Sequence, residues 1–337
     1  MKDRVSARAG PPVNSIVHGN CIEQLARLPE GWVDLCFADP PFNIGYRYHN
    51  YDDRRDVDEY LDFSRQWIRA VHRALRPGGS FYLAIGDEFA ADLCVIARRE
   101  LGFTLRSWII WHYTFGQQTK KRFAKSHTHI LYLSKGDDLS EITFNADAVR
   151  VASARQTTYA DHRANPKGKL PDDTWFLRPQ ETQIVEPSYA ALMKGRSDVL
   201  PFFDPESDTW FVSRVCGTFK EREGWHGCQM PIAILDRIIK ASSNPGDVVL
   251  DPFNGSGTTV VSAAMLERRY VGIDQSEEYV AFARKRLDHA LEVRAGGPGI
   301  ETALFDASRE SRIQTKSDAL GRPRVKRTYR RRAPAEV

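Results

Sequence analysis

Residues 248–259, which read Val-Val-Leu-Asp-Pro-Phe-Asn-Gly-Ser-Gly-Thr-Thr, decide the fold of this chain. The apolar run at 248–250 predicts a buried strand, and the sequence that continues to about Arg268 predicts a helix. Gly255 and Gly257 stand between them, where the backbone must turn tightly and can approach a ligand. The first turn of the helix offers unpaired N–H groups to that ligand. The unit therefore predicts a binding crevice of an α/β protein.

An acidic residue ends the next predicted strand. Asp274 follows the apolar run at 270–273 and lies 17 residues after Gly257. An acid in this place can bind ribose hydroxyls in a Rossmann-type crevice. A dinucleotide fingerprint would require a third glycine at position 260, where the chain has Val260. The pattern favours a nucleoside without a pyrophosphate.

Outward from this unit, apolar runs and amphipathic segments alternate along the chain. The other predicted strands are 14–20, 33–38, 80–85, 103–113 and 129–135. The other predicted helices are 21–28, 60–75, 88–101, 232–241 and 277–293. This alternation predicts an α/β fold with a Rossmann-like, doubly wound, mostly parallel sheet of seven strands, one of them an antiparallel edge strand.

A second motif, Asp39-Pro40-Pro41-Phe42, follows the predicted strand 33–38 directly. The two prolines cannot donate to a sheet ladder, so the strand ends there. Ligands of open α/β sheets bind beyond the carboxyl ends of the strands. The Asp39 carboxylate and the Pro40 carbonyl are two acceptors that could hold both hydrogens of an NH2 group, and Phe42 offers a flat face to a heterocycle. The segment after it, 43–56, is predicted to be a mobile loop.

The composition excludes several classes of protein. With 337 residues, 42% apolar and 27% charged, the chain can bury a full core and is not wholly disordered. No membrane helix and no secretory signal are expected. The five cysteines form no CxxC pair and are expected to be reduced, buried thiols of a cytoplasmic protein.

Charge is concentrated at the end of the chain. Residues 321–337 carry a surplus of +6, so the rest of a chain with net charge +4 has −2. Gly321-Arg322-Pro323 resembles the core of an AT-hook, which binds the minor groove. A disordered cationic arm of this kind suits a polyanion. A solubility tail remains an equal alternative.

Between the two motif-bearing halves, the regular pattern weakens. This insertion is polar and mixes basic residues with aromatic ones, namely Trp175, Phe176, Trp210 and Phe211. Basic and aromatic side chains can contact phosphates and base edges. Four parts are expected: residues 14–136, the insertion at 137–225, residues 226–294 and a disordered basic tail at 295–337.

Taken together, the two motifs resemble those of the amino-methyltransferases of DNA, which use S-adenosyl-L-methionine. The catalytic motif precedes the cofactor motif, which is the circularly permuted order of the family's β class. Further matches are Gly19-Asn20 and the segment from Trp210 to Pro231, and the resemblance covers residues 14–293. It implies that 14–136 is a catalytic half, 137–225 a target-recognition insertion and 226–294 a cofactor-binding half. It also implies double-stranded DNA as substrate, with a cognate restriction endonuclease as a partner in some systems. Monomer and homodimer remain open.

The resemblance also implies roles for individual residues. Asp39 and the Pro40 carbonyl would bind the target amino group, Pro41 would keep the motif rigid, and Phe42 would stack on a flipped-out base. The remaining residues would bind the cofactor: Asp251 near its ammonium group, Phe253, Asn254, Gly255, Ser256, Gly257 and Thr258 along its methionine side, Asp274 at its ribose and Asn20 near its adenine.

The chain departs from the family pattern in three places. Phe42 stands where tyrosine is usual, so the hydroxyl is missing although a stacking face remains. Asn20 replaces the usual aspartate, which puts an adenine contact in doubt. The family's His-Pro-Thr-Gln-Lys-Pro is reduced to His226-Gly-Cys-Gln-Met-Pro231, which weakens the assignment of that segment.

Within the family, aspartate at the first catalytic position goes mostly with N6-adenine, and the sequence therefore favours a site-specific adenine methyltransferase. N4-cytosine methylation is the alternative within the family. A nicotinamide-dependent oxidoreductase and a catalytically silent nucleic-acid-binding module are more remote alternatives. No metal is expected, because His127, His129, His226 and Cys228 match no zinc spacing.

Overall fold

The computed structural model describes residues 13–45, 53–117, 120–121, 123, 125–151, 153–157, 161–177 and 229–295. All of them belong to one compact unit, Met1–Ile300. The predicted basic tail, most of the insertion, and the residues Cys216, His226 and Cys228 lie outside the described residues.

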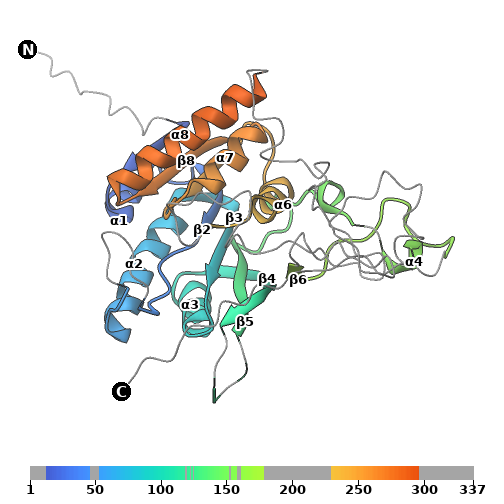
Figure 1. Ribbon diagram of the computed structural model, residues 1–337, viewed down its shortest axis with the longest axis horizontal. Helices are drawn as coiled ribbons and strands as arrows, with labels where there is room; N and C mark the ends of the chain where they lie inside the picture. Colours follow the sequence, from blue (N-terminus) through green and yellow to red (C-terminus); the bar gives the residue numbers. More distant parts are fainter. Residues whose placement is uncertain are drawn as a thin grey trace, which may run out of the picture. The chain divides into compact units, whose positions relative to one another are not determined.

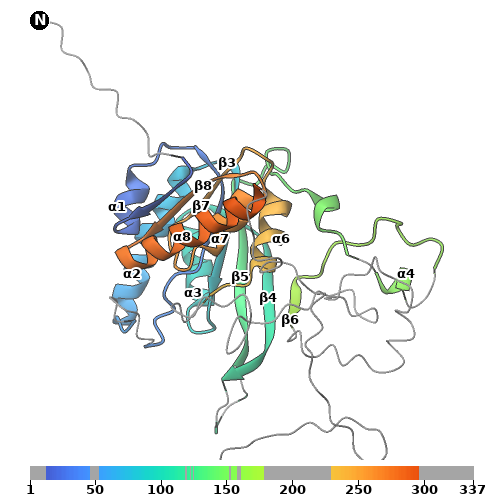
Figure 2. The same ribbon diagram turned by 45° about the horizontal axis from the view of Figure 1, so that its top comes forward.

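The described residues build one eight-stranded sheet (Figures 1 and 2). The strands, in spatial order, are β1 Ser15–His18, β8 Arg269–Asp274, β7 Val248–Asp251, β2 Val33–Ala38, β3 Leu75–Ile85, β5 Lys125–Lys135, β4 Phe103–Gln117 and β6 Thr174–Leu177. All neighbouring strands are parallel except that β5 runs antiparallel to both β3 and β4. The predicted doubly wound, mostly parallel sheet is confirmed, with its seven predicted strands all present.

Two details differ from the sequence-based expectation. The antiparallel strand β5 lies inside the sheet, between β3 and β4, instead of at an edge. Strands β4 and β5 are antiparallel neighbours in sequence, and their apolar patterns do not tell which of the two pairs with β3. The eighth strand, β6, pairs with β4 from within the insertion, where no strand was expected.

Helices cover both faces of the sheet (Figures 1 and 2). On one face α1 Cys21–Ala26 packs on α2 Val57–Ala74, which packs on α3 Ala90–Val95; on the other face α7 Thr258–Met265 packs on both α6 Ile232–Ser242 and α8 Glu277–Arg294. A π-helical turn, Ile96–Glu100, continues α3, so the predicted helix 88–101 begins later than expected and changes its winding. A 3-10 turn at Ala146–Val149 and the short α4 at Ala154–Thr157 lie between β5 and β6.

The amphipathic pattern of α2 explains how the core forms. Tyr60, Trp67, Ile68 and Val71 recur at helical spacing and are fully buried. Trp67 packs edge-on against Phe81 of β3, with ring centroids 6.0 Å apart. Asp56 caps the start of the helix, since its side chain accepts a hydrogen bond from the Asp58 amide. Helix α2 is thereby fixed against the sheet.

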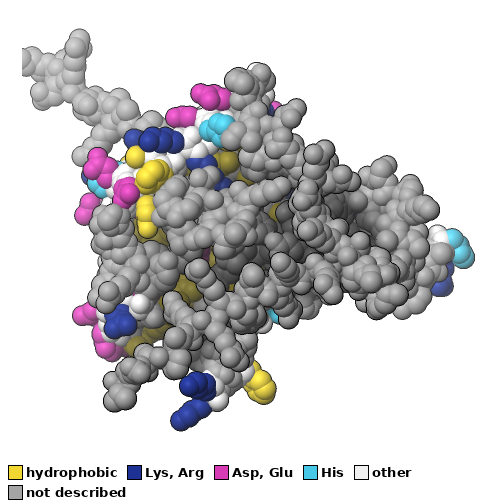
Figure 3. Space-filling view, in the orientation of Figure 1, with side chains coloured by type: hydrophobic (Ala, Val, Ile, Leu, Met, Phe, Trp, Pro, Cys, Tyr) yellow, Lys and Arg dark blue, Asp and Glu magenta, His cyan; other side chains and the backbone are white. Residues whose placement is uncertain are grey.

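Ion pairs and free thiols are present among the described residues. Acidic and basic side chains are interspersed on the face that Figure 3 shows, and Arg65, for example, contacts both Asp62 and Glu100. Cys21, Cys36 and Cys94 are buried free thiols. Among the described residues, no helix is long and apolar enough to cross a membrane.

Register places the two predicted motifs at the same edge of the sheet. Strands β2 and β7 are neighbours, with Cys36 opposite Leu250, and β7 pairs with β8, with Asp251 opposite Gly272. Because parallel strands end at a common edge, the residues that follow β2, β7 and β8 lie next to one another.

Candidate active site

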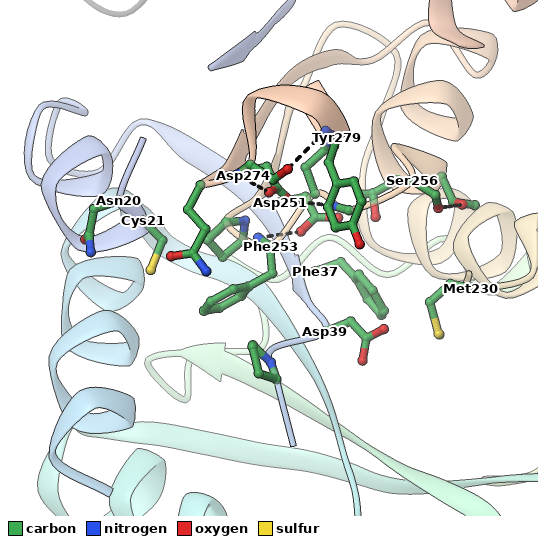
Figure 4. A pocket seen from close by; sticks show the side chains of 18 of the residues that line it. Asn20, Cys21, Phe37, Asp39, Met230, Asp251, Phe253, Ser256, Asp274 and Tyr279 are labelled. Carbon is green, nitrogen blue, oxygen red and sulfur yellow. Dashed lines mark hydrogen bonds between the residues drawn. The ribbon is translucent and has the colours of Figure 1, made fainter. Parts of the chain in front are cut away.

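A single pocket joins the two motifs (Figure 4). The space inside it, counted together with its open mouth, is about 1100 Å³. Its lining includes Gly19, Asn20, Cys21, Phe37, Asp39, Pro41, Arg55, Phe63, Met230, Asp251, Pro252, Phe253, Asn254, Gly255, Ser256, Thr258, Thr259, Asp274, Gln275, Ser276 and Tyr279. Residues near 39 and residues near 255 therefore converge on one cleft.

The first motif occupies the end of β2. Asp39 and Pro41 line the pocket, whereas Pro40 is buried and Phe42 is half-buried. The Phe42 ring lies against Gly86: a Cβ placed on that glycine would come within 3.2 Å of Cδ2 of Phe42. The Tyr60 hydroxyl donates a hydrogen bond to the Pro41 carbonyl over 2.8 Å. The motif is therefore held in a defined conformation by its surroundings.

The second motif forms the turn between β7 and α7. Gly255 and Gly257 both adopt positive φ angles, 45° and 79°, which other residues adopt only at a cost. Gly257 does not line the pocket but precedes α7 directly, and a Cβ there would lie 2.9 Å from that of Ala283. Arg286 of α8 donates to the Ser256 carbonyl and the Thr258 hydroxyl, over 3.1 and 2.9 Å. The turn is thereby braced from behind.

Two carboxyl groups lie at the centre of the pocket (Figure 4). Asp251 is almost completely buried, and this burial raises its pKa to about 7. Its Oδ1 accepts a hydrogen bond from the Phe253 amide over 2.9 Å. Burial also raises the pKa of Asp274, although the amides of Ser276 and Gly255 donate to its two oxygens. Buried carboxyl groups in a cleft are typical of a functional site that receives a cation or a hydroxyl group.

Asn20 and Asn254 contribute in different ways. The Asn20 side-chain oxygen accepts hydrogen bonds from the amides of Ile22 and Glu23, over 2.9 and 3.3 Å, and so caps α1 at the pocket wall. Asn254 is buried, and its side-chain oxygen and nitrogen have no hydrogen-bond partner among the described residues. A buried polar group of this kind calls for an explanation, and a polar ligand is one.

Several lining residues were not anticipated as site residues, namely Cys21, Phe37, Arg55, Phe63, Met230 and Tyr279. Phe63 has the same helical spacing as the core positions of α2, so its pattern gives no sign of a ligand. It packs edge-on against Phe253, with centroids 6.4 Å apart, and the Arg55 guanidinium lies 4.3 Å from the centre of its ring. Only the fold brings these residues to the pocket.

A second polar cluster lies just beyond β3. His127 and His129 approach the Asp87 carboxylate, with Nε2 to Oδ1 distances of 3.1 and 3.2 Å. The Trp108 indole donates to Nδ1 of His129 over 2.8 Å, so the proton of neutral His129 is on Nε2, facing Asp87. A metal ion on Nε2 would move this proton to Nδ1. The N–H group at Nδ1 would then face the N–H group of the Trp108 indole. Hydrogen bonding therefore accounts for this cluster better than metal ligation.

The pocket suits a nucleoside that carries cationic groups. Two carboxyls, the backbone amides of a glycine turn and the rings of Phe37 and Phe253 surround one space. S-adenosylmethionine has complementary groups: a sulfonium, an ammonium, a ribose and an adenine. Fold and pocket together define the class of an α/β methyltransferase.

Comparison with known proteins identifies the family. The family model described as DNA methylase, for N6 and N4 methylation, matches residues 33–285. The DNA adenine methyltransferase YhdJ of Escherichia coli (strain K12) is 34% identical over 291 residues, 86% of this chain and 87% of that protein. The Type II methyltransferase M.HpaI of Haemophilus parainfluenzae is 32% identical over 274 residues, 81% of this chain and 74% of that protein. The chain belongs to the S-adenosylmethionine-dependent DNA methyltransferases that modify N6 of adenine or N4 of cytosine.

Solved structures share the fold. The M1.HpyAVI complex with S-adenosylmethionine superposes with a TM-score of 0.51 at 21% identity, over 81% of this chain and 98% of that chain. The cytosine-N4-specific PvuII DNA methyltransferase has a TM-score of 0.51 at 16% identity, over 86% of this chain and 94% of that chain. Family membership decides against the nicotinamide-dependent oxidoreductase. The circular permutation of the motifs stays a prediction.

Proposed function

We propose that this protein is a site-specific DNA methyltransferase that modifies the exocyclic N6 of adenine in double-stranded DNA. The observation that carries the proposal is the convergence of Asp39 and Pro41 with Asp251 and Asp274 on one pocket. An amino acceptor and a methyl donor bound there would lie side by side.

Asp39 and the Pro40 carbonyl are the proposed acceptors for the amino group. The nitrogen of adenine is a poor nucleophile because its lone pair is delocalised into the ring. Two acceptors that hold both N–H groups favour a more tetrahedral nitrogen with a localised lone pair. S-adenosylmethionine supplies an electrophilic methyl group on its sulfonium. Acceptors fixed in a pocket stabilise the positive charge that develops on the nitrogen.

Phe42 is the proposed stacking face for the base. The amino group cannot be reached inside a duplex, so the base must leave the helix. An aromatic ring replaces part of the lost stacking, and base–aromatic stacking contributes about 1–3 kcal/mol. Phe42 is only half-buried and packs on Gly86 on one side.

The cofactor residues are proposed as the resemblance implies. Asp251 lies next to the ammonium group, Asp274 holds the ribose hydroxyls, and Asn20 is near the adenine. The turn formed by Phe253, Asn254, Gly255, Ser256 and Thr258 follows the methionine side, with Gly257 keeping its shape.

Adenine is favoured over cytosine on two grounds. Asp39 is the residue that family members specific for adenine mostly carry at this position. The relative that is 34% identical is named a DNA adenine methyltransferase. Cytosine N4 remains the second candidate.

Residues 137–225 are proposed to read the target sequence, and the tail 321–337 is proposed as a phosphate-binding arm. Strand β6 anchors the insertion to β4. The similarity to Type II methyltransferases such as M.HpaI supports a search for a cognate restriction endonuclease.

One experiment tests the chemistry and the base together. DNA from cells that express the wild-type protein is sequenced with detection of modified bases, next to DNA from cells that express Asp39→Ala. We expect N6-methyladenine in one sequence context with the wild type and none with the variant. Calorimetry should find S-adenosylmethionine bound equally by both proteins. Undiminished methylation by the variant would contradict the role of Asp39. Detection of N4-methylcytosine in place of N6-methyladenine would show that the target base is cytosine.

A further inference from the structure

The segment directly after the base-binding tetrapeptide is tied to a buried acid. Asp53 is fully buried. Its Oδ1 accepts a hydrogen bond from the Asn43 amide over 2.7 Å, and its Oδ2 accepts one from the Ile44 amide over 3.0 Å. The sequence suggested a mobile loop over 43–56. In the structure, the start of that loop is fixed by a carboxylate ten residues further on.

Further hydrogen bonds join the same two segments, residues 43–45 and 53–55. The Asn43 side chain accepts from the Arg55 amide over 2.7 Å and donates to the Arg55 carbonyl over 3.0 Å. The Gly45 amide donates to the Asp53 carbonyl over 2.8 Å. Asn43 has a φ of 56°, a left-handed conformation that the surrounding contacts must impose. Residues 43–45 and 53–55 are therefore held side by side by hydrogen bonds.

A third contact fixes the tetrapeptide from the side of α2. The Tyr60 hydroxyl donates to the Pro41 carbonyl over 2.8 Å. The Tyr60 ring is fully buried and packs on Phe89, with centroids 4.5 Å apart. We call Asn43, Asp53 and Tyr60 the latch, because they hold both the backbone of the tetrapeptide and the residues that follow it.

We propose that Asp53, acting through the latch, is a positioning residue for the base-binding tetrapeptide. The inference rests on the proposed role of residues 39–42. Burying a carboxylate is unfavourable unless hydrogen bonds compensate it. Here the two oxygens of Asp53 accept from the amides of Asn43 and Ile44, which directly follow Phe42. Two acceptors must meet both hydrogens of one amino group, and a displacement of about 1 Å can reduce a rate about 100-fold.

Two substitutions test the latch separately. Asp53→Asn keeps the shape but turns one acceptor into an NH2 group that faces a backbone N–H. Tyr60→Phe removes the bond to the Pro41 carbonyl and keeps the ring. We expect kcat to fall about 10- to 100-fold in Asp53→Asn and by less in Tyr60→Phe. The dissociation constant of S-adenosylmethionine should change by a smaller factor than kcat, because Asp251, Asp274 and the turn at 253–258 do not belong to the latch.

Asp34→Asn is the matched control. Asp34 lies near the start of β2, the strand that Asp39 follows, and its carboxylate accepts from Nε of Arg76 over 2.7 Å and from the Val248 amide over 2.8 Å. This substitution weakens the folded state through the same kind of bond, at a distance from the tetrapeptide. Thermal unfolding of all variants gives the fraction folded, by which each kcat is corrected.

A second measurement follows the base itself. Target DNA with a fluorescent base analogue at the methylated position (2-aminopurine for adenine) brightens when that base leaves the stack. With S-adenosylmethionine saturating, Asp53→Asn should give a smaller increase than the wild type, and Asp34→Asn an unchanged one. Equal corrected kcat values for Asp53→Asn and Asp34→Asn would overturn the inference, as would a loss of cofactor affinity that matches the loss of kcat. An active Asp39→Ala would instead contradict the role of the tetrapeptide.

Discussion

The buried carboxyl of Asp251 makes the stability of the protein depend on pH in a direction that can be measured. Burial raises its pKa from 3.8 to about 7 in the folded protein. Between these values the unfolded chain has already lost the proton while the folded protein keeps it. Stability should therefore fall as pH rises from about 4 to about 7 and stay constant above. A rise of about three units corresponds to about 4 kcal/mol in total.

Asp251→Asn removes this ionisation while it leaves an oxygen that can accept from the Phe253 amide. Urea unfolding of the full chain without ligand is measured at pH 5, 6, 7 and 8 and at constant ionic strength. From pH 5 to pH 8 the difference in unfolding free energy should move in favour of the variant by about 2–3 kcal/mol. Parallel profiles of wild type and variant would refute the argument, because every other titrating group is shared by both.

The same carboxyl links cofactor binding to pH. An ammonium group next to Asp251 favours the ionised form, so binding should release a proton below pH 7. The affinity for S-adenosylmethionine should rise by up to about tenfold per pH unit up to about pH 7 and then level off. Calorimetry in buffers of different ionisation enthalpy counts the protons released. A flat profile would remove Asp251 from the neighbourhood of the cation.

The remaining predictions concern shape and charge. Gly272→Ala places a Cβ 2.5 Å from the Asn254 side-chain oxygen. The substitution should lower the melting temperature by several degrees and weaken cofactor binding measured by calorimetry. An unchanged affinity would argue against Asn254 as a residue that lines the cofactor site. Gly86→Ala places a Cβ 3.2 Å from the Phe42 ring; kcat should fall while cofactor affinity stays constant, and the opposite pattern would assign Phe42 to the cofactor side. Deleting 321–337 should weaken DNA binding and flatten the slope of log K against log salt, because the deleted part carries a surplus of +6; an unchanged slope would leave the tail without a role in binding.

The fold was predictable where short-range patterns determine it. Buried parallel strands are continuous apolar runs, and residues 35–38 and 248–250 have this pattern. The interior position of β5 was not predictable, because it depends on which of two apolar strands pairs with β3. Pro77, Gly78 and Gly79 were expected to separate helix from strand. They instead belong to β3, where the pairing with β2 is irregular: Val33 lies opposite Leu75, but Leu35 lies opposite Ser80.

The two halves of the candidate site differ in how far sequence alone defines them. The cofactor half is nearly contiguous, since residues 251–258 and Asp274 belong to one strand–helix–strand unit whose geometry is standard. On the base side, Asp39 was recognisable as the acid after a strand. The residues that contact positions 41–44, namely Asp53, Tyr60 and Gly86, come from three separate places, and no spacing rule connects them.

This difference has a physical cause that bears on how the enzyme can vary. Most of the proposed cofactor residues belong to one local turn, 251–258, and to the end of the next strand, and therefore lie close together in sequence, whereas Asn20 reaches the pocket from the start of α1. The tetrapeptide proposed to bind the base needs a rigid support, and the hydrogen bonds of the Asp53 carboxylate and the Tyr60 hydroxyl come from separate parts of the chain. Other side chains could replace Asp53 and Tyr60 if they hydrogen-bond to the same backbone groups, the amides of residues 43 and 44 and the carbonyl of residue 41. Related enzymes with the same tetrapeptide should therefore hold it by different side chains, and a substitution that is harmless in one of them should reduce kcat in another.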